Sequence, residues 1–415
     1  MSFAALRPLR HRDFALLWTA SLVSNIGTWI QTIAVGTILA TETGKASTLG
    51  WAAAAAFLPS AILSPVGGLI SDRVRRKRFL IGSLVFDTVL ATTLAALLAS
   101  GHHSPALLSL LLFVEGSSGA LSHPNRQALM PELLPPEDLL PAVALGAASW
   151  NGGRVVGPLI AGLVIPAFGA TWAVILNAAS FAVMVVAAMF INLPARKSLE
   201  VDDSVVKRLR AGVSAIRATS AGREALVRVA LLGASAGPFI GLIPIVAHNV
   251  FHGNARTNSI FVTAQGLGAV IGVLSGATIA EVIGHRATLQ VATLTGGAAL
   301  VGYGLSPNVG IAALALVIVG GSYFIVLSGS QAMAQGATEP NFRARVISLF
   351  SVALGLSYTI AVLANGFLAD AIGLRTTTVM QGVLCLVSGA WLLARYRMPS
   401  ATRQRTRRTS ATDQC

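Results

Sequence analysis

The chain of 415 residues is 54% hydrophobic and 11% charged, with a formal net charge of +14 and a mean hydropathy of +0.72. Soluble proteins carry roughly a quarter charged residues, so this composition excludes an ordinary soluble domain and indicates a protein of the lipid bilayer. Such a net charge would indicate nucleic-acid binding in a soluble domain, but here the basic residues lie between apolar stretches, so we expect no nucleic-acid partner.

Twelve apolar stretches are each long enough to cross a bilayer, which takes about 20 apolar residues in a helix. They are longer than the strands of a membrane barrel, which have about ten residues and alternate apolar with polar. We therefore predict an all-α integral membrane protein with twelve transmembrane helices. The expected spans are 14–40, 47–71, 79–100, 105–123, 139–167, 170–193, 225–250, 258–281, 287–305, 309–334, 345–370 and 376–395.

The longest polar interruption divides these spans six and six. The predicted domains are an N-terminal bundle at 1–193, a cytoplasmic linker at 194–223, a C-terminal bundle at 224–396 and a basic tail at 397–415. Within the linker, apolar residues recur every three or four positions, which predicts an amphipathic helix on the membrane surface. These residues are Val206, Leu209, Val213 and Ile216. A solvated connection with no further role is the alternative.

The distribution of Lys and Arg predicts the orientation. With the N-terminus inside, 26 of the 30 basic residues fall on the inner side, as the positive-inside rule requires. Only Lys45, Arg256 and Arg375 fall outside, and Arg154 lies within a span. Both termini are therefore expected in the cytoplasm.

The two halves repeat each other's polar connections. The stretch 67–77 between spans two and three resembles 276–286 between spans eight and nine, and 124–128 resembles 340–344. Paired patterns at matching places indicate an internal duplication.

The stretch Gly68-x-x-x-Asp72-Arg73-x-x-Arg76-Lys77 resembles the signature loop of the major facilitator superfamily, with Arg75 in place of a second glycine. The block 124–162 most resembles the drug- and siderophore-efflux branch of that family, which includes enterobactin and macrolide exporters. The resemblance implies two pseudo-symmetric six-helix bundles in a bacterial inner membrane, working as a monomer.

The signature loop is the predicted cytoplasmic gate. Asp72 ends a helix near lipid, where an unpaired carboxylate is costly; it can accept from Arg126 or face the N-terminus of another helix. The family pattern implies helix eleven, which starts near Arg343, as the partner when the cytoplasmic side is closed. Alternatively, the basic residues only set the topology. The candidate gate residues are Gly68, Asp72, Arg73, Arg76, Lys77, Arg126, Glu281, Arg286 and Arg343.

The pattern Gly153-x-x-x-Gly157-Pro158-x-x-Ala161-Gly162 in span five is similar to a motif found mainly in antiporters, with Ala161 replacing one glycine. Small residues four apart allow two helices to approach closely, and Pro158 can bend its helix. The motif favours export, although ordinary helix packing would use the same residues.

Ionisable residues inside a membrane are functional candidates. Asp87, Glu115 and Arg154 lie within spans three, four and five. We predict that Asp87 or Glu115 carries a coupling proton and that Arg154 sets its affinity; a static buried ion pair is the alternative.

The expected function is secondary active, proton-coupled efflux of a small amphipathic molecule by alternating access, with no cofactor and no metal site. An importer of the same fold and a non-transporting receptor or scaffold are the alternatives. No His-Glu-x-x-His or phosphate-binding loop occurs, so neither an enzyme nor an ATP-driven pump is expected. The candidate cavity residues are Asn25, Trp29, Gln31, Trp150, Asn151, Asn177, Gln265, Gln331, Tyr358 and Asn365.

Overall fold

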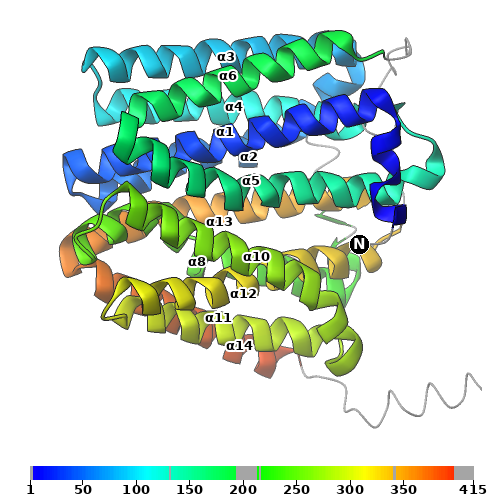
Figure 1. The fold of residues 1–415 in the computed structure, drawn as a ribbon. Coiled ribbons are helices and arrows are strands. Elements are labelled where there is room, and N and C mark those ends of the chain that lie inside the picture. The colour runs from blue at the N-terminus through cyan, green and yellow to red at the C-terminus, as the bar shows by residue number, and fades with distance from the viewer. Residues whose placement is uncertain (1–2, 130–131, 193–212, 215, 340–342, 397–415) are drawn as a thin grey trace, which may run out of the picture.

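Helices that run side by side form two groups, one from each half of the chain (Figure 1). The structure is a computed structural model that describes residues 3–129, 132–192, 213–214, 216–339 and 343–396. No strand occurs among these residues, so the predicted all-α class is confirmed.

The N-terminal half contains a short 3-10 helix followed by six long helices. These are η1 (Phe3–Arg10), α1 (Arg12–Thr43), α2 (Ala46–Arg73), α3 (Arg76–Ser100), α4 (Pro105–Leu129), α5 (Leu139–Phe168) and α6 (Ala170–Phe190), with the 3-10 turn η3 (Pro136–Asp138) before α5. The turns between them are tight. Gly44 ends α1 and Gly101 ends α3 with φ of 60° and 70°, a left-handed conformation that glycine adopts without strain.

The C-terminal half follows the same plan with one interruption. Its elements are α8 (Ser220–Ser235), α9 (Phe239–Ile245), the π-helical turn η4 (Val246–Val250), α10 (Ala255–Ile283), α11 (His285–Leu305), α12 (Val309–Gly336), α13 (Arg343–Ile372) and α14 (Leu374–Arg395). Span seven was expected as one helix over 225–250, but the structure divides it between α8 and α9. Pro238 has no backbone N–H to continue the α8 hydrogen-bond ladder, so the helix restarts after it.

Eleven helices of the described chain are long and apolar enough to cross a membrane, with 220–250 counted as one of them. The twelfth predicted span is α11, whose hydropathy is lowered by polar side chains that face its neighbours. Thr288, Gln290 and Thr293 are buried, and Gln290 Nε2 donates to the carbonyl of Gly389 at 2.7 Å. Inward-facing polar groups thus explain the weaker signal.

The same helix pairs pack in both halves, which confirms the predicted duplication. Helix α2 packs on α4 as α10 packs on α12, α3 on α6 as α11 on α14, and α1 on α5 as α8 on α13. The halves meet through the pairs α2–α13 and α5–α10. The two pairs are equivalent to each other, because α2 corresponds to α10 and α5 corresponds to α13 in the two repeats.

The described residues include only the last part of the predicted linker, 213–214 and 216–223. Val206 and Leu209 lie outside them, as does the tail at 397–415. Ile216 is described and is fully buried, packing with Val346 and Phe350 of α13.

Candidate functional site between the two halves

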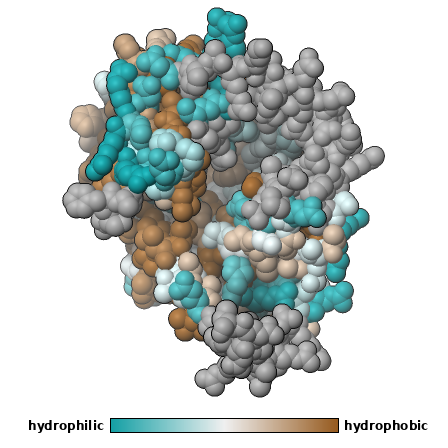
Figure 2. Space-filling view, turned by 90° about the vertical axis from the view of Figure 1, so that its right-hand side faces the viewer, coloured by the Kyte–Doolittle hydropathy of each residue, from teal (hydrophilic) through white to brown (hydrophobic). Residues whose placement is uncertain are grey.

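The two ends of the bundle differ in how closely the halves approach. We call the end with the α2–α3 connection the basic end, and the end with the Gly44 turn the opposite end. Seen from the basic end, the surface is hollowed between the two halves (Figure 2). At the opposite end the halves are packed together.

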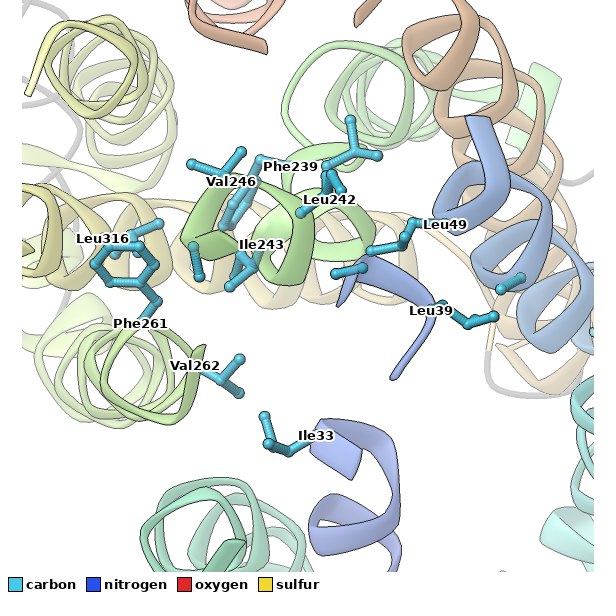
Figure 3. Packing of buried hydrophobic residues seen from close by; sticks show 14 of the residues in the cluster. Ile33, Leu39, Leu49, Phe239, Leu242, Ile243, Val246, Phe261, Val262 and Leu316 are labelled. Atoms are coloured by element: carbon cyan, nitrogen blue, oxygen red, sulfur yellow. The ribbon is translucent and has the colours of Figure 1, made fainter. Parts of the chain in front are cut away.

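An apolar seal closes the opposite end (Figure 3). Side chains from α1 and α2 of the first half pack with side chains from α9, η4, α10 and α12 of the second. The labelled members are Ile33, Leu39, Leu49, Phe239, Leu242, Ile243, Val246, Phe261, Val262 and Leu316. Such a dry contact excludes water from the space between the halves at this end.

Polar contacts reinforce the seal. The carboxylate of Asp370, in the last turns of α13, accepts the backbone N–H groups of Ala46 at 2.7 Å and Ser47 at 3.0 Å. These are the first residues of α2, so an exposed carboxylate of one half caps a helix N-terminus of the other. Asn249 Nδ2 also donates to the carbonyl of Gly44 at 2.8 Å.

Asp370 was not among the residues predicted for the gate. The duplication did not point to it, because span two repeats as span eight, where the acidic residue is Glu281, and only the docking of the two halves brings Asp370 to Ala46.

Arg154 lies where the halves meet near the middle of α5. Its side chain is buried, and Nη2 donates to Gln265 Oε1 of α10 at 2.5 Å. Its guanidinium carbon lies 5.1 Å from the ring centroid of Trp29 on α1 and 4.9 Å from that of Phe324 on α12. Arg154 thus connects four helices from both halves.

The predicted coupling carboxylates lie elsewhere, inside the N-terminal half. Gln31 Nε2 donates to Glu115 Oε2 at 2.8 Å, and Asn177 Nδ2 donates to Gln31 Oε1 at 2.8 Å. Asp87 is buried and accepts from Ser118 at 2.5 Å. Of the described contacts of Arg154, none joins it to either carboxylate.

The nearby cation for Asp87 is Arg126, which interacts with it electrostatically and donates to Ser122 at 3.1 Å. Asp87, Arg126 and Glu115 therefore form one electrostatic group in α3 and α4, separate from Arg154. Whether this group carries a proton stays a prediction.

The antiporter-type motif forms the contact between α5 and α1. A Cβ atom on Gly157 would lie 2.5 Å from Trp29 Cβ and 2.8 Å from the carbonyl of Ile26, and one on Gly153 would lie 2.8 Å from Asn25 Cβ. Gly162 instead faces Ser259 of α10 in the other half. Pro158 is buried within α5, which continues past it. The glycines thus seat Trp29 and Arg154 side by side.

We expect Gly157→Ala to weaken this contact and Gly152→Ala to be tolerated. Overpacking of a close helix contact costs about 1–3 kcal/mol. The methyl group that Gly157→Ala introduces would meet the backbone carbonyl of Ile26 and the Cβ atom of Trp29. Gly152, on the same helix, has only Leu22 Cδ1 at 3.7 Å from the added atom. The free energy of unfolding in mixed micelles would measure both changes. Equal stability of the two variants would contradict the tight-contact interpretation.

The described gate residues at the basic end make contacts within their own halves. Arg76 forms an ion pair with Glu132, and Lys77 Nζ donates to the carbonyls of Met189 and Ile191 at 2.8 and 2.7 Å. Lys77 thereby caps the C-terminus of α6, where a cation is favoured. The surroundings of Gly68 and the side chains of Asp72, Arg73 and Arg343 lie outside the described part of the structure.

In the second half, a buried carboxylate that the sequence analysis did not select joins two arginines. Glu224 of α8 pairs with Arg228 at 3.0 Å and with Arg286 of α11 at 2.9 Å. Glu281, the acidic gate candidate of this connection, is exposed at the end of α10. Spacing along the chain could not reveal a partner on α8.

The remaining cavity candidates occupy different environments. Asn25 donates to Ser149 at 3.0 Å and Trp150 packs edge-on against Trp29, with ring centroids 6.0 Å apart. Tyr358 packs against Phe57 of the other half.

Four further candidates stay within one half. Asn151 donates to the carbonyl of Ala147 at 2.8 Å, and Gln331 is partly buried on α12. Asn365 accepts from Gln381 of α14 at 3.0 Å, and Asn177 belongs to the Glu115 network. The candidates that gather around Arg154 at the junction of the halves are therefore Trp29, Trp150 and Gln265, while Tyr358 lies at the α2–α13 contact.

Two repeated six-helix halves with a polar and aromatic junction between them define a multi-pass membrane transporter of the major facilitator type. A family model described as transmembrane secretion effector matches residues 3–413, and the chain belongs to that family.

The chain is 23% identical over 381 residues to macrolide efflux protein A of Streptococcus pyogenes, covering 90% of this chain and 93% of that protein. It is 22% identical over 368 residues to the staphyloferrin A transporter of Staphylococcus aureus, covering 88% and 92%. Its fold resembles a bacterial homologue of the human lysosomal transporter Spinster in an inward-facing, unoccupied conformation. That match has a TM-score of 0.75 and 13% identity, and covers 95% of this chain and 97% of the other.

Proposed function

We propose that the protein is a secondary active exporter that moves a small amphipathic molecule out of a bacterial cell by alternating access. Similarity to macrolide efflux protein A over nine-tenths of the chain carries this proposal, and the family's description as secretion effectors supports it. The cycle would have no catalytic step and would need no cofactor, because a proton gradient would supply the energy.

The arrangement of the two ends supports the same proposal. The apolar seal and the Asp370 cap close the opposite end, while the basic end is hollowed between the halves (Figures 2 and 3). In a bacterial inner membrane, the basic end and both termini would face the cytoplasm by the positive-inside rule. The structure would then correspond to an inward-facing conformation of a monomer, and the export step would require the seal to open.

Proton coupling is proposed for the electrostatic group of Asp87, Glu115 and Arg126. Buried carboxylates in a membrane are costly unless they bind a proton or a cation, and Asp87 interacts with the cation Arg126 inside the N-terminal half. The amide of Gln31 donates a hydrogen bond to Glu115, so protonation of that carboxylate would alter the contact of Gln31.

Transport into inside-out vesicles with an acidic lumen tests both the direction and the coupling. We expect a macrolide or staphyloferrin A to accumulate in the lumen as protons leave, and we expect the accumulation to stop when the pH gradient is collapsed. Glu115→Gln or Asp87→Asn should reduce the gradient-driven rate about tenfold or more, while Glu137→Gln, at an exposed carboxylate, should leave it unchanged.

Accumulation that needs the opposite gradient would identify an importer. No flux of any solute would favour a receptor or scaffold, and undiminished gradient-driven flux in both carboxylate variants would reject their role in coupling.

A further inference from the structure

The buried charge of Arg154 has no counter-charge in the described part of the chain. Among the described residues, no Asp or Glu lies within ion-pair distance of its guanidinium; its hydrogen-bond partner is the neutral amide of Gln265. The rings of Trp29 and Phe324 stack on the cation, and Tyr323 is the further titratable group that acts on it. The described groups that face Arg154 from α1, α10 and α12 are therefore neutral.

Such an arrangement is costly for a structural role alone. A buried cation loses much of its favourable hydration, and cation–π contacts compensate that loss only in part. With a side chain only 5% exposed, Arg154 keeps a net positive potential at the junction of the halves. A ligand that brings negative charge would remove that cost.

The hydrogen-bonding groups around Arg154 point to the same kind of ligand. Arg154 Nε, Trp29 Nε1 and Gln265 Nε2 are buried and have no hydrogen-bond partner among the described residues. All three are N–H donors, and none can be satisfied by another donor. What this cluster lacks is an acceptor.

Aromatic side chains form the walls of the cluster. Trp150, which packs edge-on against Trp29, is 46% exposed and gives the cluster an accessible face, and Phe324 packs against Tyr323 on the other side. Flat apolar walls beside a cationic donor set suit a solute with a ring or chain next to one anionic oxygen group.

We propose that Arg154, Trp29 and Gln265 form the subsite that binds a carboxylate, or an equivalent anionic oxygen group, of the transported solute. This inference rests on the proposed transport function and names the chemical class of its substrate. Because the subsite draws on helices of both halves, an anion bound there would contact α5 and α10 together and would be sensitive to their separation.

Two matched fluorescent probes test the subsite directly. Dansylglycine carries a carboxylate at neutral pH, and dansylglycinamide replaces it with a neutral amide of the same shape. Binding to the full chain in phosphatidylcholine nanodiscs is followed by energy transfer from tryptophan, after subtraction of empty nanodiscs. We expect saturable binding with a preference of about tenfold or more for the carboxylate, the range of a charge-assisted hydrogen bond.

The variants separate recognition from folding. Arg154→Gln should remove the preference by weakening dansylglycine binding alone, and Arg154→Lys should retain part of it because the charge remains. Arg375→Gln is the matched control, since Arg375 also stacks on an aromatic ring, Phe251 at 5.7 Å, but at the opposite end. Monodispersity and thermal denaturation in each nanodisc preparation show that the variants are folded.

Absence of saturable dansylglycine binding, equal affinity for both probes, or parallel loss of both probes in Arg154→Gln would overturn the inference. The last result would make Arg154 a structural clamp between the halves. The binding assay is independent of direction and coupling. Carboxylate preference without solute flux in vesicles would therefore reject the proposed function and keep the subsite, and the reverse outcome would reject only the subsite.

Discussion

A disulfide between Thr37→Cys and Asn258→Cys is expected to abolish transport. Asn258 Nδ2 of α10 donates to Thr37 Oγ1 of α1 at 3.0 Å, so the two side chains touch across the sealed end and lie in different halves. If export requires the seal to open, a covalent bond here holds the chain in one orientation. Solute flux should fall to background after oxidation and recover after reduction.

The matched control places the same crosslink inside one half. Thr295 Oγ1 and Ser322 Oγ lie 3.2 Å apart on α11 and α12, so Thr295→Cys with Ser322→Cys leaves the relative motion of the halves free. Both pairs are made in a chain lacking Cys415; Cys385 can remain because it is buried. Full transport by the oxidised Thr37–Asn258 pair would show that the seal does not open during the cycle.

The largest loss of stability is expected from Glu224→Gln. Its carboxylate is 1% exposed, and it compensates Arg228, which is 3% exposed, as well as Arg286. Removing one partner of a buried ion pair costs about 3–5 kcal/mol because the other charge stays buried and unpaired. The free energy of unfolding in mixed micelles measures the change.

Two further variants identify the cause of that loss. Glu281→Gln makes the same substitution at an exposed carboxylate of the same end, and we expect it to change stability by less than about 0.5 kcal/mol. Adding Arg228→Met to Glu224→Gln should recover most of the loss, because no buried unpaired charge would then remain among the α8 residues. A double variant as unstable as the single one would show that packing, not charge, dominates at this position.

Much of the fold could be predicted because bilayer thickness and hydropathy set the length and number of helices. The twelve spans, the division into two halves and the repeated connections all follow from patterns local to one helix or one turn. The close approach of α5 to α1 also follows from local spacing, since Gly153 and Gly157 lie four residues apart. The interruption of span seven was missed because Gly237 and Pro238 lie within a continuous apolar run.

The partners across the bundle could not be predicted. Arg154 faces Gln265 rather than a carboxylate, and Asp370 reaches Ala46, more than 300 positions away in the sequence. Such contacts depend on how the two halves are oriented relative to each other, and no periodicity along one helix specifies that orientation. The sequence therefore indicated which polar residues lie within the membrane, but not their partners. Arg154 was predicted to act on Asp87 or Glu115, whereas the cation near Asp87 is Arg126.

The Asp370 contact bears on the difference in free energy between the two orientations of the transporter. Helices α2 and α13 run in opposite directions and pack along each other, and each carries a carboxylate near its end, Asp72 and Asp370. If Asp72 caps α13 when the basic end shuts, as the signature loop implies, each orientation loses one cap and gains another of the same kind. The ratio of the two orientations without solute then depends on a small difference between the free energies of the two caps. A change of about 1.4 kcal/mol is enough to shift that ratio tenfold. The two orientations of such a chain can have nearly equal free energies, so that binding of one solute molecule or one proton is enough to change which orientation predominates.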